Sequence, residues 1–192
     1  MILKKFQYIT LLFLLLGSGL FAQEDVLVLS PSNATDTTTF MNVQILADIA
    51  ANGGVILPNR VYELQRDAIY MHNSIITVNA GQTIRLRAQV GTGKKPVVYL
   101  YDAGTGTGRP PGNMFVLNGG DMDFKNICIA GYFELVEDNV DGVQGGLINT
   151  TAAGSNIKVD GVIFSNINGQ HIRTGFDVGT VDVRNTIFAN MG

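Results

Sequence analysis

The sequence has little charge, a single cysteine and no tryptophan. Lys and Arg number 13 and Asp and Glu 16 among its 192 residues, which gives a net charge of −3. No basic excess is available to neutralise phosphates, so nucleic acid is not expected as a partner. The lone Cys128 excludes a disulfide scaffold and a zinc site made of several cysteines, and we expect it to be buried. What remains is a glycine-rich chain, 46% hydrophobic, of a length typical of one folded domain.

Residues 1–22 have the pattern of a secretory signal peptide. Lys4 and Lys5 precede an apolar stretch over 9–16, and Ala22 is a suitable residue before the cleavage site. The apolar stretch is shorter than the roughly 20 residues of a membrane-spanning helix, which disfavours the alternative of a retained anchor. We therefore predict a secreted or cell-surface protein with no transmembrane span after cleavage. Residues 23–39 are predicted to be a polar lead-in.

One helix is predicted, over residues 40–53. Its apolar residues recur at spacings of three and four and would form one face: Phe40, Val43, Leu46, Ala47 and Ala50. The rest of the chain favours short strands separated by Asn, Gly, Pro or Asp, with the first strands at 55–57, 61–64, 74–78, 83–88 and 97–101. Two segments, 103–113 and the acidic 132–146, are predicted to be loops.

Three segments of the chain align without gaps: 122–131, 157–166 and 181–190. Each begins with an alternating strand and then reaches a residue that tolerates a left-handed backbone, namely Asn126, Gly161 or Asn185. A second strand follows, with Ile129, Phe164 and Phe188 in equivalent positions. Residues 84–88 are a fainter fourth copy. Repeated strand–corner–strand units without intervening helices favour a β-solenoid, and the alternative is an antiparallel sandwich of similar strands.

The sequence resembles the right-handed parallel β-helix, or pectin-lyase-like, superfamily. The block at residues 46–64 is similar to the capping helix and first coil of that family, and residues 82–88 and 95–98 resemble its next coils. The resemblance implies an all-β fold, a right-handed parallel β-helix (solenoid) over residues 40–192 with an N-terminal capping α-helix. No cap follows the last repeat, so we expect the chain to be the N-terminal portion of a longer protein.

The catalytic motifs of this superfamily do not carry over. Its hydrolases use an Asn-Thr-Asp, an Asp-Asp and a Gly-His-Gly, whereas here Asn149-Thr150 is followed by Thr151 and His171 lies in Gln170-His-Ile. Its lyases use Arg or Lys as a base with calcium held by aspartates, so the resemblance implies calcium as a cofactor without identifying its ligands. We therefore assign no catalytic and no metal-binding residue.

Charged residues within the repeat are the candidates for substrate binding: Lys158, Asp160, Arg173, Asp182 and Arg184. The alignment places Lys158 beside Asp182 and Asp160 beside Arg184, with opposite signs in each pair. A structural ladder that fixes strand register is the favoured interpretation of these pairs, and a carbohydrate-binding patch is the alternative. His171 and Arg173 are expected to be surface residues.

Three functions are consistent with these features, the third being a purely structural solenoid inside a larger secreted protein. The first is a secreted protein that acts on or binds extracellular polysaccharide, such as a polysaccharide lyase whose catalytic coils follow residue 192. The second is a non-catalytic, adhesin-like cell-surface β-helix that binds glycans or proteins. Fold resemblance does not choose between them, because activity depends on the site and not on the architecture.

Overall fold

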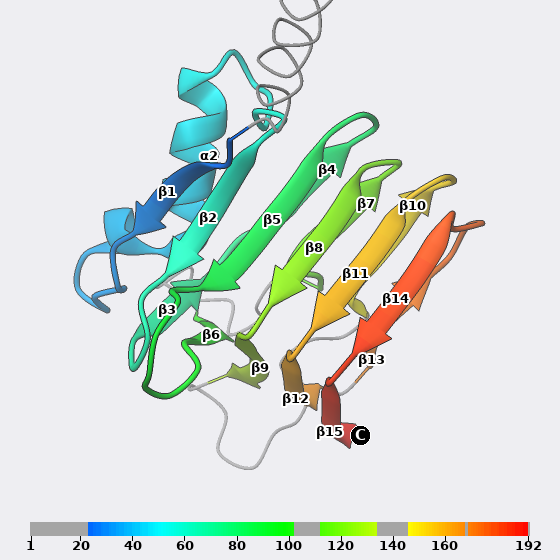
Figure 1. Ribbon diagram of the computed structural model, residues 1–192. Coiled ribbons are helices and arrows are strands. Elements are labelled where there is room, and N and C mark those ends of the chain that lie inside the picture. Colours follow the sequence, from blue (N-terminus) through cyan, green and yellow to red (C-terminus); the bar gives the residue numbers. More distant parts are fainter. Residues whose placement is uncertain (1–22, 102–111, 134–145, 168, 192) are drawn as a thin grey trace, which may run out of the picture.

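The computed structural model describes residues 23–101, 112–133, 146–167 and 169–191. The predicted signal peptide, the acidic segment 134–145 and most of the predicted loop 103–113 lie outside these ranges. The described residues form one α-helix, one short 3₁₀ helix and fifteen strands (Figure 1). The helices are η1 (Thr37–Thr39) and α2 (Met41–Ala51).

The strands belong to three sheets, and every pairing between strands is parallel. The front sheet has the order β1 (Asp25–Leu29), β2 (Arg60–Leu64), β5 (Thr83–Ala88), β8 (Asp121–Lys125), β11 (Asn156–Asp160), β14 (Thr180–Arg184). The second sheet contains β3 (Ile69–His72), β6 (Val97–Leu100), β9 (Cys128–Phe133), β12 (Ile163–Ile167) and β15 (Ile187–Met191). The third contains β4 (Ile76–Asn79), β7 (Phe115–Asn118), β10 (Gly146–Ala152) and β13 (Gln170–Thr174).

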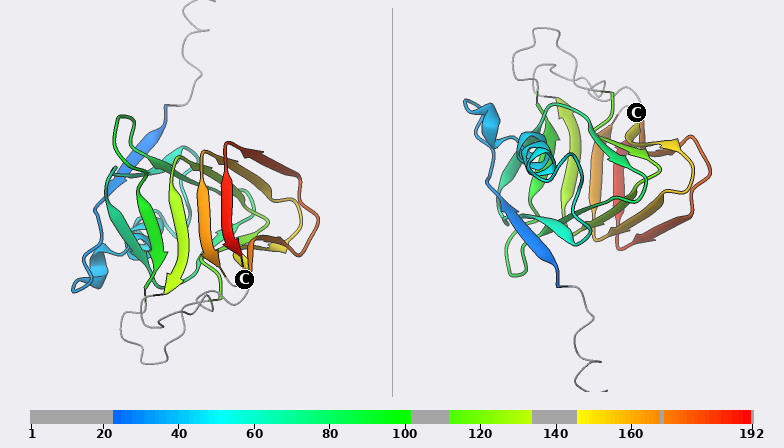
Figure 2. Two further views of the ribbon diagram at one scale, coloured as in Figure 1. Left: turned by 90° about the horizontal axis from the view of Figure 1, so that it is seen from below. Right: turned by 90° about the horizontal axis from the view of Figure 1, so that it is seen from above.

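From β2 onward the chain visits the front, second and third sheets in a fixed rotation. Each strand therefore pairs with the strand three places further along the chain, and each pass through the three sheets forms one repeating unit. Figure 2 shows the units side by side along the molecule. The all-β class and the parallel pairing were predicted from the sequence, and the antiparallel sandwich is excluded for the described strands.

The alignment predicted for the repeats is confirmed, because the aligned residues pair with one another in the front sheet. Ile157 pairs with Met122 on one side and with Val181 on the other, and Ile84 pairs with Met122. In the second sheet, Phe164 pairs with both Ile129 and Phe188. The predicted corner residues have left-handed backbones, with φ of +57° at Asn126, +66° at Gly161 and +48° at Asn185. Gly and Asn occupy these corners because they adopt positive φ at the lowest cost.

The core lies between the three sheets and is filled by the inward-facing residue of each alternating pair. In the front sheet, Leu86, Met122, Phe124, Ile157 and Val159 are almost completely buried. Phe115 from the third sheet packs edge-on against Phe124, with 4.9 Å between ring centroids. Burial of this much apolar area is the main stabilising contribution to the fold.

Helix α2 matches the predicted range, but its buried face differs from the predicted one. Met41 and Ile45 are buried in the core, whereas Leu46 is 38% exposed and Ala47 and Ala50 are exposed. The reason is a polar anchor: buried Asn42 donates to Asn73 Oδ1 (2.9 Å) and to Ser74 Oγ (2.6 Å), which turns this side of the helix toward the end of β3. The helix lies at the β1–β2 end of the front sheet, far from β14 (Figure 1).

Several strand predictions need correction. Strand β1 lies in the segment predicted to be a polar lead-in and pairs along its whole length with β2. Strand β3 was not predicted, and neither were β7, β10 and β13 of the third sheet. Conversely, the predicted strand at 55–57 is not a strand, although its central residue Ile56 is buried in the core.

Candidate functional site: the charged face of the front sheet

The outer surface of the front sheet carries charged side chains from four neighbouring strands. We call this surface the charged face and define it by Arg85 and Arg87 of β5, Asp123 and Lys125 of β8, Lys158 and Asp160 of β11, and Asp182 and Arg184 of β14. Burial alternates along β5, β8 and β11, so these residues point outward while the residues between them are buried in the core. Strand geometry makes this placement necessary, because successive side chains leave a strand on opposite faces.

The charged face consists of two rows in register across the strands. One row runs Arg85, Asp123, Lys158, Asp182 and alternates in sign at every step. The other runs Arg87, Lys125, Asp160, Arg184 and begins at Glu63 of β2. The two predicted neighbour pairs, Lys158 with Asp182 and Asp160 with Arg184, are therefore both confirmed as register partners.

The ion pairs of the last strands form along a strand and not between strands. Arg184 Nε lies 2.8 Å from Asp182 Oδ1, and Lys125 Nζ lies 3.3 Å from Asp123 Oδ2, each within a single strand. Asp160 instead accepts a hydrogen bond from Asn185 Nδ2 at 2.9 Å. Lys158 is exposed and takes part in no ion pair among the described residues. Oppositely charged residues on β8, β11 and β14 are therefore neighbours across the strands, but they form no ion pair with one another.

Beside the two charged rows lies a row of shorter polar side chains. Asp121 Oδ1 accepts hydrogen bonds from the backbone N–H of Asn156 (2.7 Å) and from its Nδ2 (3.0 Å). Asn156 Oδ1 in turn accepts from the Thr180 hydroxyl at 2.9 Å. This chain of bonds joins β8, β11 and β14 and fixes their register at the start of each strand.

A shallow pocket lies at the N-terminal side of the charged face. It is lined by Glu24, Val61, Arg85, Leu86, Arg87, Asp123 and Lys125. Arg87 bridges Glu24 (2.5 Å) and Glu63 (2.9 Å), and these carboxylates raise the pKa of its guanidinium against the opposing effect of burial. Asp123 Oδ1 is buried and accepts no hydrogen bond from the described residues, while Oδ2 of the same carboxylate pairs with Lys125.

Four of the five predicted binding residues come together on the charged face, and Arg173 does not. Arg173 lies on β13 in the third sheet, where it is exposed and in register with Asn149. The sequence reasoning did not select Arg85 and Arg87. Their signal was the faint fourth copy of the repeat, which aligns Arg85 with Asp123 and Arg87 with Lys125.

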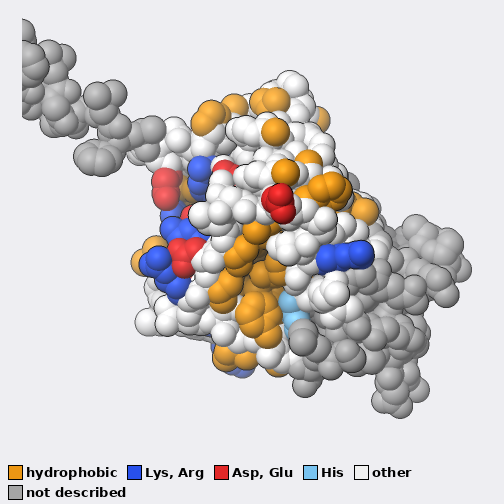
Figure 3. Space-filling view, turned by 90° about the vertical axis from the view of Figure 1, so that its right-hand side faces the viewer, with side chains coloured by type: hydrophobic (Ala, Val, Ile, Leu, Met, Phe, Trp, Pro, Cys, Tyr) orange, Lys and Arg blue, Asp and Glu red, His pale blue; other side chains and the backbone are white. Residues whose placement is uncertain are grey.

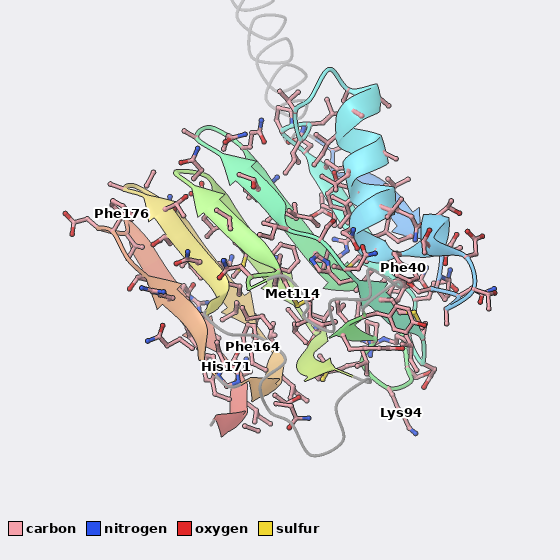
Figure 4. All side chains as sticks on the ribbon, turned by 180° about the vertical axis from the view of Figure 1, so that it is seen from behind. Phe40, Lys94, Met114, Phe164, His171 and Phe176 are labelled. Atoms are coloured by element: carbon pink, nitrogen blue, oxygen red, sulfur yellow. The ribbon has the colours of Figure 1, made fainter. Side chains whose placement is uncertain are left out.

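His171, predicted to be a surface residue, is buried and only 2% exposed. Its ring lies against Phe164 and Phe188, with centroids 5.8 and 5.4 Å away, and burial lowers the pKa of the imidazole (Figure 4). The prediction was wrong because its neighbours Gln170 and Ile172 leave the inward direction of the strand ambiguous. His171 belongs to the core and not to a binding surface.

Cys128 is half-buried, so the expected burial is only partial. Desolvation raises the pKa of its thiol, opposed by the charge of Lys95 and a hydrogen bond with Ser165. A raised pKa disfavours the reactive thiolate at neutral pH.

No metal site is formed by the part of the chain that the structure describes. Within it, no group of three or more His, Cys, Asp or Glu side chains is placed to hold an ion. The calcium implied by the family resemblance therefore has no ligand set among these residues, and the acidic segment 134–145 lies outside them. Nor does any described helix have the length and apolar character needed to cross a membrane.

Comparison with known proteins finds no matching family model, no matching curated protein and no matching solved structure. The charged face itself is therefore the basis for assigning a function. That surface offers many hydrogen-bonding and ionic groups on a regular grid, which suits a repetitive ligand better than a small one. Its pocket has an empty volume of about 310 Å³, part of which is open solvent, and is therefore at the lower limit of typical small-molecule sites.

Proposed function

We propose that this chain is a secreted right-handed parallel β-helix that binds extracellular polysaccharide on its charged face. Support for the β-helix comes from the rotation of the chain through three parallel sheets and from the left-handed corner at Asn126, Gly161 and Asn185. Helix α2 is its N-terminal cap, since Met41 and Ile45 bury apolar surface at the β1–β2 end. The charged N-terminal region and apolar stretch of residues 1–22 support export.

The observation that carries the binding proposal is the register of the two charged rows. Neighbouring strands lie about 4.8 Å apart, so the same sign recurs in the alternating row at every second strand, about 9.6 Å apart. A linear polymer of similar sugars can repeat the same contact at that interval. Each contact is weak, but linked contacts add because every later one is intramolecular.

The chemistry of the rows fits sugar hydroxyl and acidic groups. Lys158 is exposed without an ion-pair partner among the described residues and can donate to a hydroxyl or a carboxylate. Asp182, the register partner of Lys158, has a partly exposed carboxylate that can accept a hydrogen bond from a hydroxyl. Hydrogen-bond donors and acceptors thus alternate along one row. This arrangement suits sugar hydroxyls, because each hydroxyl both donates and accepts a hydrogen bond.

The test is affinity electrophoresis of the purified protein in gels containing single polysaccharides, with polygalacturonate, alginate and a neutral xylan as probes. Retardation by at least one probe is expected. Lys158→Ala should weaken the retardation several-fold, whereas the matched Arg173→Ala variant, which removes an exposed cation from another sheet, should not.

Three results would contradict the proposal or change it. Absence of retardation by every probe contradicts binding, and equal loss in the two variants contradicts the assignment to the charged face. Appearance of unsaturated uronate products in the same incubations would replace simple binding by lyase activity.

A further inference from the structure

The predicted cleavage site makes a glutamine the first residue of the exported chain. Cleavage after Ala22 removes residues 1–22, and the next residue is Gln23. A glutamine at the start of a chain has a free α-amino nitrogen within reach of its own side-chain amide, and closure of a five-membered ring between them is an intramolecular reaction. Export therefore gives Gln23 a reactivity that the other glutamines of the chain, which have no free α-amino group, do not share.

In the structure Gln23 is free to react, whereas the residues after it are held. Its side chain is exposed and forms no hydrogen bond or ion pair with another described residue. Directly after it, Glu24 Oε2 lies 2.5 Å from Arg87 Nη1, and β1 begins one residue later, at Asp25. Ring closure at Gln23 thus breaks no contact of the folded protein.

Glu24 and Asp25 secure the first strand of the front sheet. The Glu24 carboxylate pairs with Arg87 of β5. Asp25 Oδ2 lies 2.9 Å from Arg60 Nη1 of β2, and the Asp25 backbone N–H donates to Asn59 O at 2.9 Å. An aminopeptidase that trimmed the exported chain residue by residue would remove both carboxylates after the first residue. Such an enzyme needs a free α-amino group, so a ring that lacks one protects these contacts.

The charge of the chain start also favours ring closure. A free α-amino group is mostly cationic at neutral pH. It would lie one residue from Glu24, which lines the shallow pocket together with Arg85, Arg87 and Lys125. Figure 3 shows that cationic and acidic side chains already crowd together along the margin of the molecule that the charged face forms. An ammonium group there would compete with Arg87 for the Glu24 carboxylate, whereas the ring nitrogen is neutral and does not.

We propose that Gln23 of the exported chain is converted to pyroglutamate, and that this ring protects the contacts of Glu24 and Asp25 from aminopeptidases. In the reaction the α-amino nitrogen bonds to Cδ, the bond between Cδ and Nε2 breaks, and ammonia leaves with a hydrogen from the α-amino nitrogen. Nothing is oxidised or reduced, and no co-reactant is consumed. This modification requires the export that the proposed function includes, but it does not require polysaccharide binding.

The first experiment is intact-mass spectrometry of the chain, expressed with its own residues 1–22 and recovered from the cell envelope and the medium. The exported protein should begin at residue 23, with a mass about 17 Da, one ammonia, below that of the uncyclised chain. The matched variant Gln23→Ala cannot form the ring and should show no such loss. An exported chain that begins at Gln23 with its full mass overturns the modification and leaves export standing, whereas a chain that keeps residues 1–22 overturns both.

The protective role is tested by digestion with an aminopeptidase. The exported protein should keep its mass, whereas the Gln23→Ala variant should lose its first residues, Glu24 and Asp25 included, over the same time. Circular dichroism before digestion should show the same fold for both proteins. Equal survival of the two would show that the fold alone protects the start of the chain, and it would overturn the role proposed for the ring.

Discussion

The left-handed corner at Asn126 gives a prediction whose sign depends on the backbone and not on side-chain contacts. Asn126 has φ of +57° and an exposed side chain, so its replacement removes little packing. A residue with a Cβ pays about 1–2 kcal/mol in this region relative to glycine. Glycine in turn costs about 0.4–1 kcal/mol through the greater freedom of its unfolded chain.

The net expectation is that Asn126→Gly is more stable than Asn126→Ala by about 0.5–1 kcal/mol. The matched control is Thr77, an exposed residue in the middle of β4. There the order should reverse, with Thr77→Ala more stable than Thr77→Gly by about 0.5–1 kcal/mol, because an ordinary strand backbone gives glycine no advantage.

Urea unfolding of the four variants, followed by circular dichroism, measures both differences. Equal slopes with denaturant are needed for the midpoints to be compared. Alanine at least as stable as glycine at position 126 would refute the left-handed corner. A glycine advantage at both positions would show instead that the difference at position 126 does not report the left-handed backbone, because the freedom of the unfolded chain disfavours glycine everywhere.

Two further predictions concern the core. Burial lowers the pKa of His72 to about 3 and also lowers that of His171, so the folded protein excludes protons that the unfolded chain binds below its ordinary histidine pKa of 6.5. The free energy of unfolding should therefore fall as the pH is lowered from about 6.5 toward 3, and His72→Phe should flatten this dependence in urea titrations at several pH values; an unchanged slope would contradict it. Leu86→Ala, at a fully buried position, should cost about 2–5 kcal/mol, whereas Ile69→Ala, at a position 51% exposed, should cost less than about 1 kcal/mol, and similar losses would contradict the assigned core.

The register of the repeats could be predicted because several positions of the aligned segments agree with one another. Met122, Ile157 and Val181 align as apolar residues, and the corner residues four positions later align by their tolerance of positive φ. An apolar residue and a corner residue four positions later must both match, and only one alignment of the segments meets both requirements. The same columns placed Lys158 beside Asp182 and Asp160 beside Arg184 on the charged face.

The features that were missed depend on contacts between distant parts of the chain. Which face of α2 is buried follows from the bonds of Asn42 to Asn73 and Ser74, some thirty residues away. The burial of His171 follows from the rings of Phe164 and Phe188, which belong to another sheet. Local spacing carries no information on either contact, so periodicity alone could not decide them.

Strand β1 illustrates a further limit. Strand β1 lies outside the aligned repeats and directly follows the predicted signal peptide. No repeated pattern in the sequence therefore indicated that it pairs with β2. Arg85 and Arg87 were missed for a related reason. The fourth copy of the repeat was recognised as a strand, but its outward residues were not carried into the charged rows.

The central claim, that the charged face binds polysaccharide, is tested most directly by lysine footprinting. The protein is acetylated briefly with and without a polysaccharide that retards it, and the modified lysines are quantified by mass spectrometry. Lys125 and Lys158 of the charged face should be protected, whereas Lys94, which is exposed on a loop away from that face, should react equally in both samples (Figure 4). Unchanged reactivity of Lys158 in the bound sample, or equal protection of Lys94, would contradict the assignment of binding to the charged face.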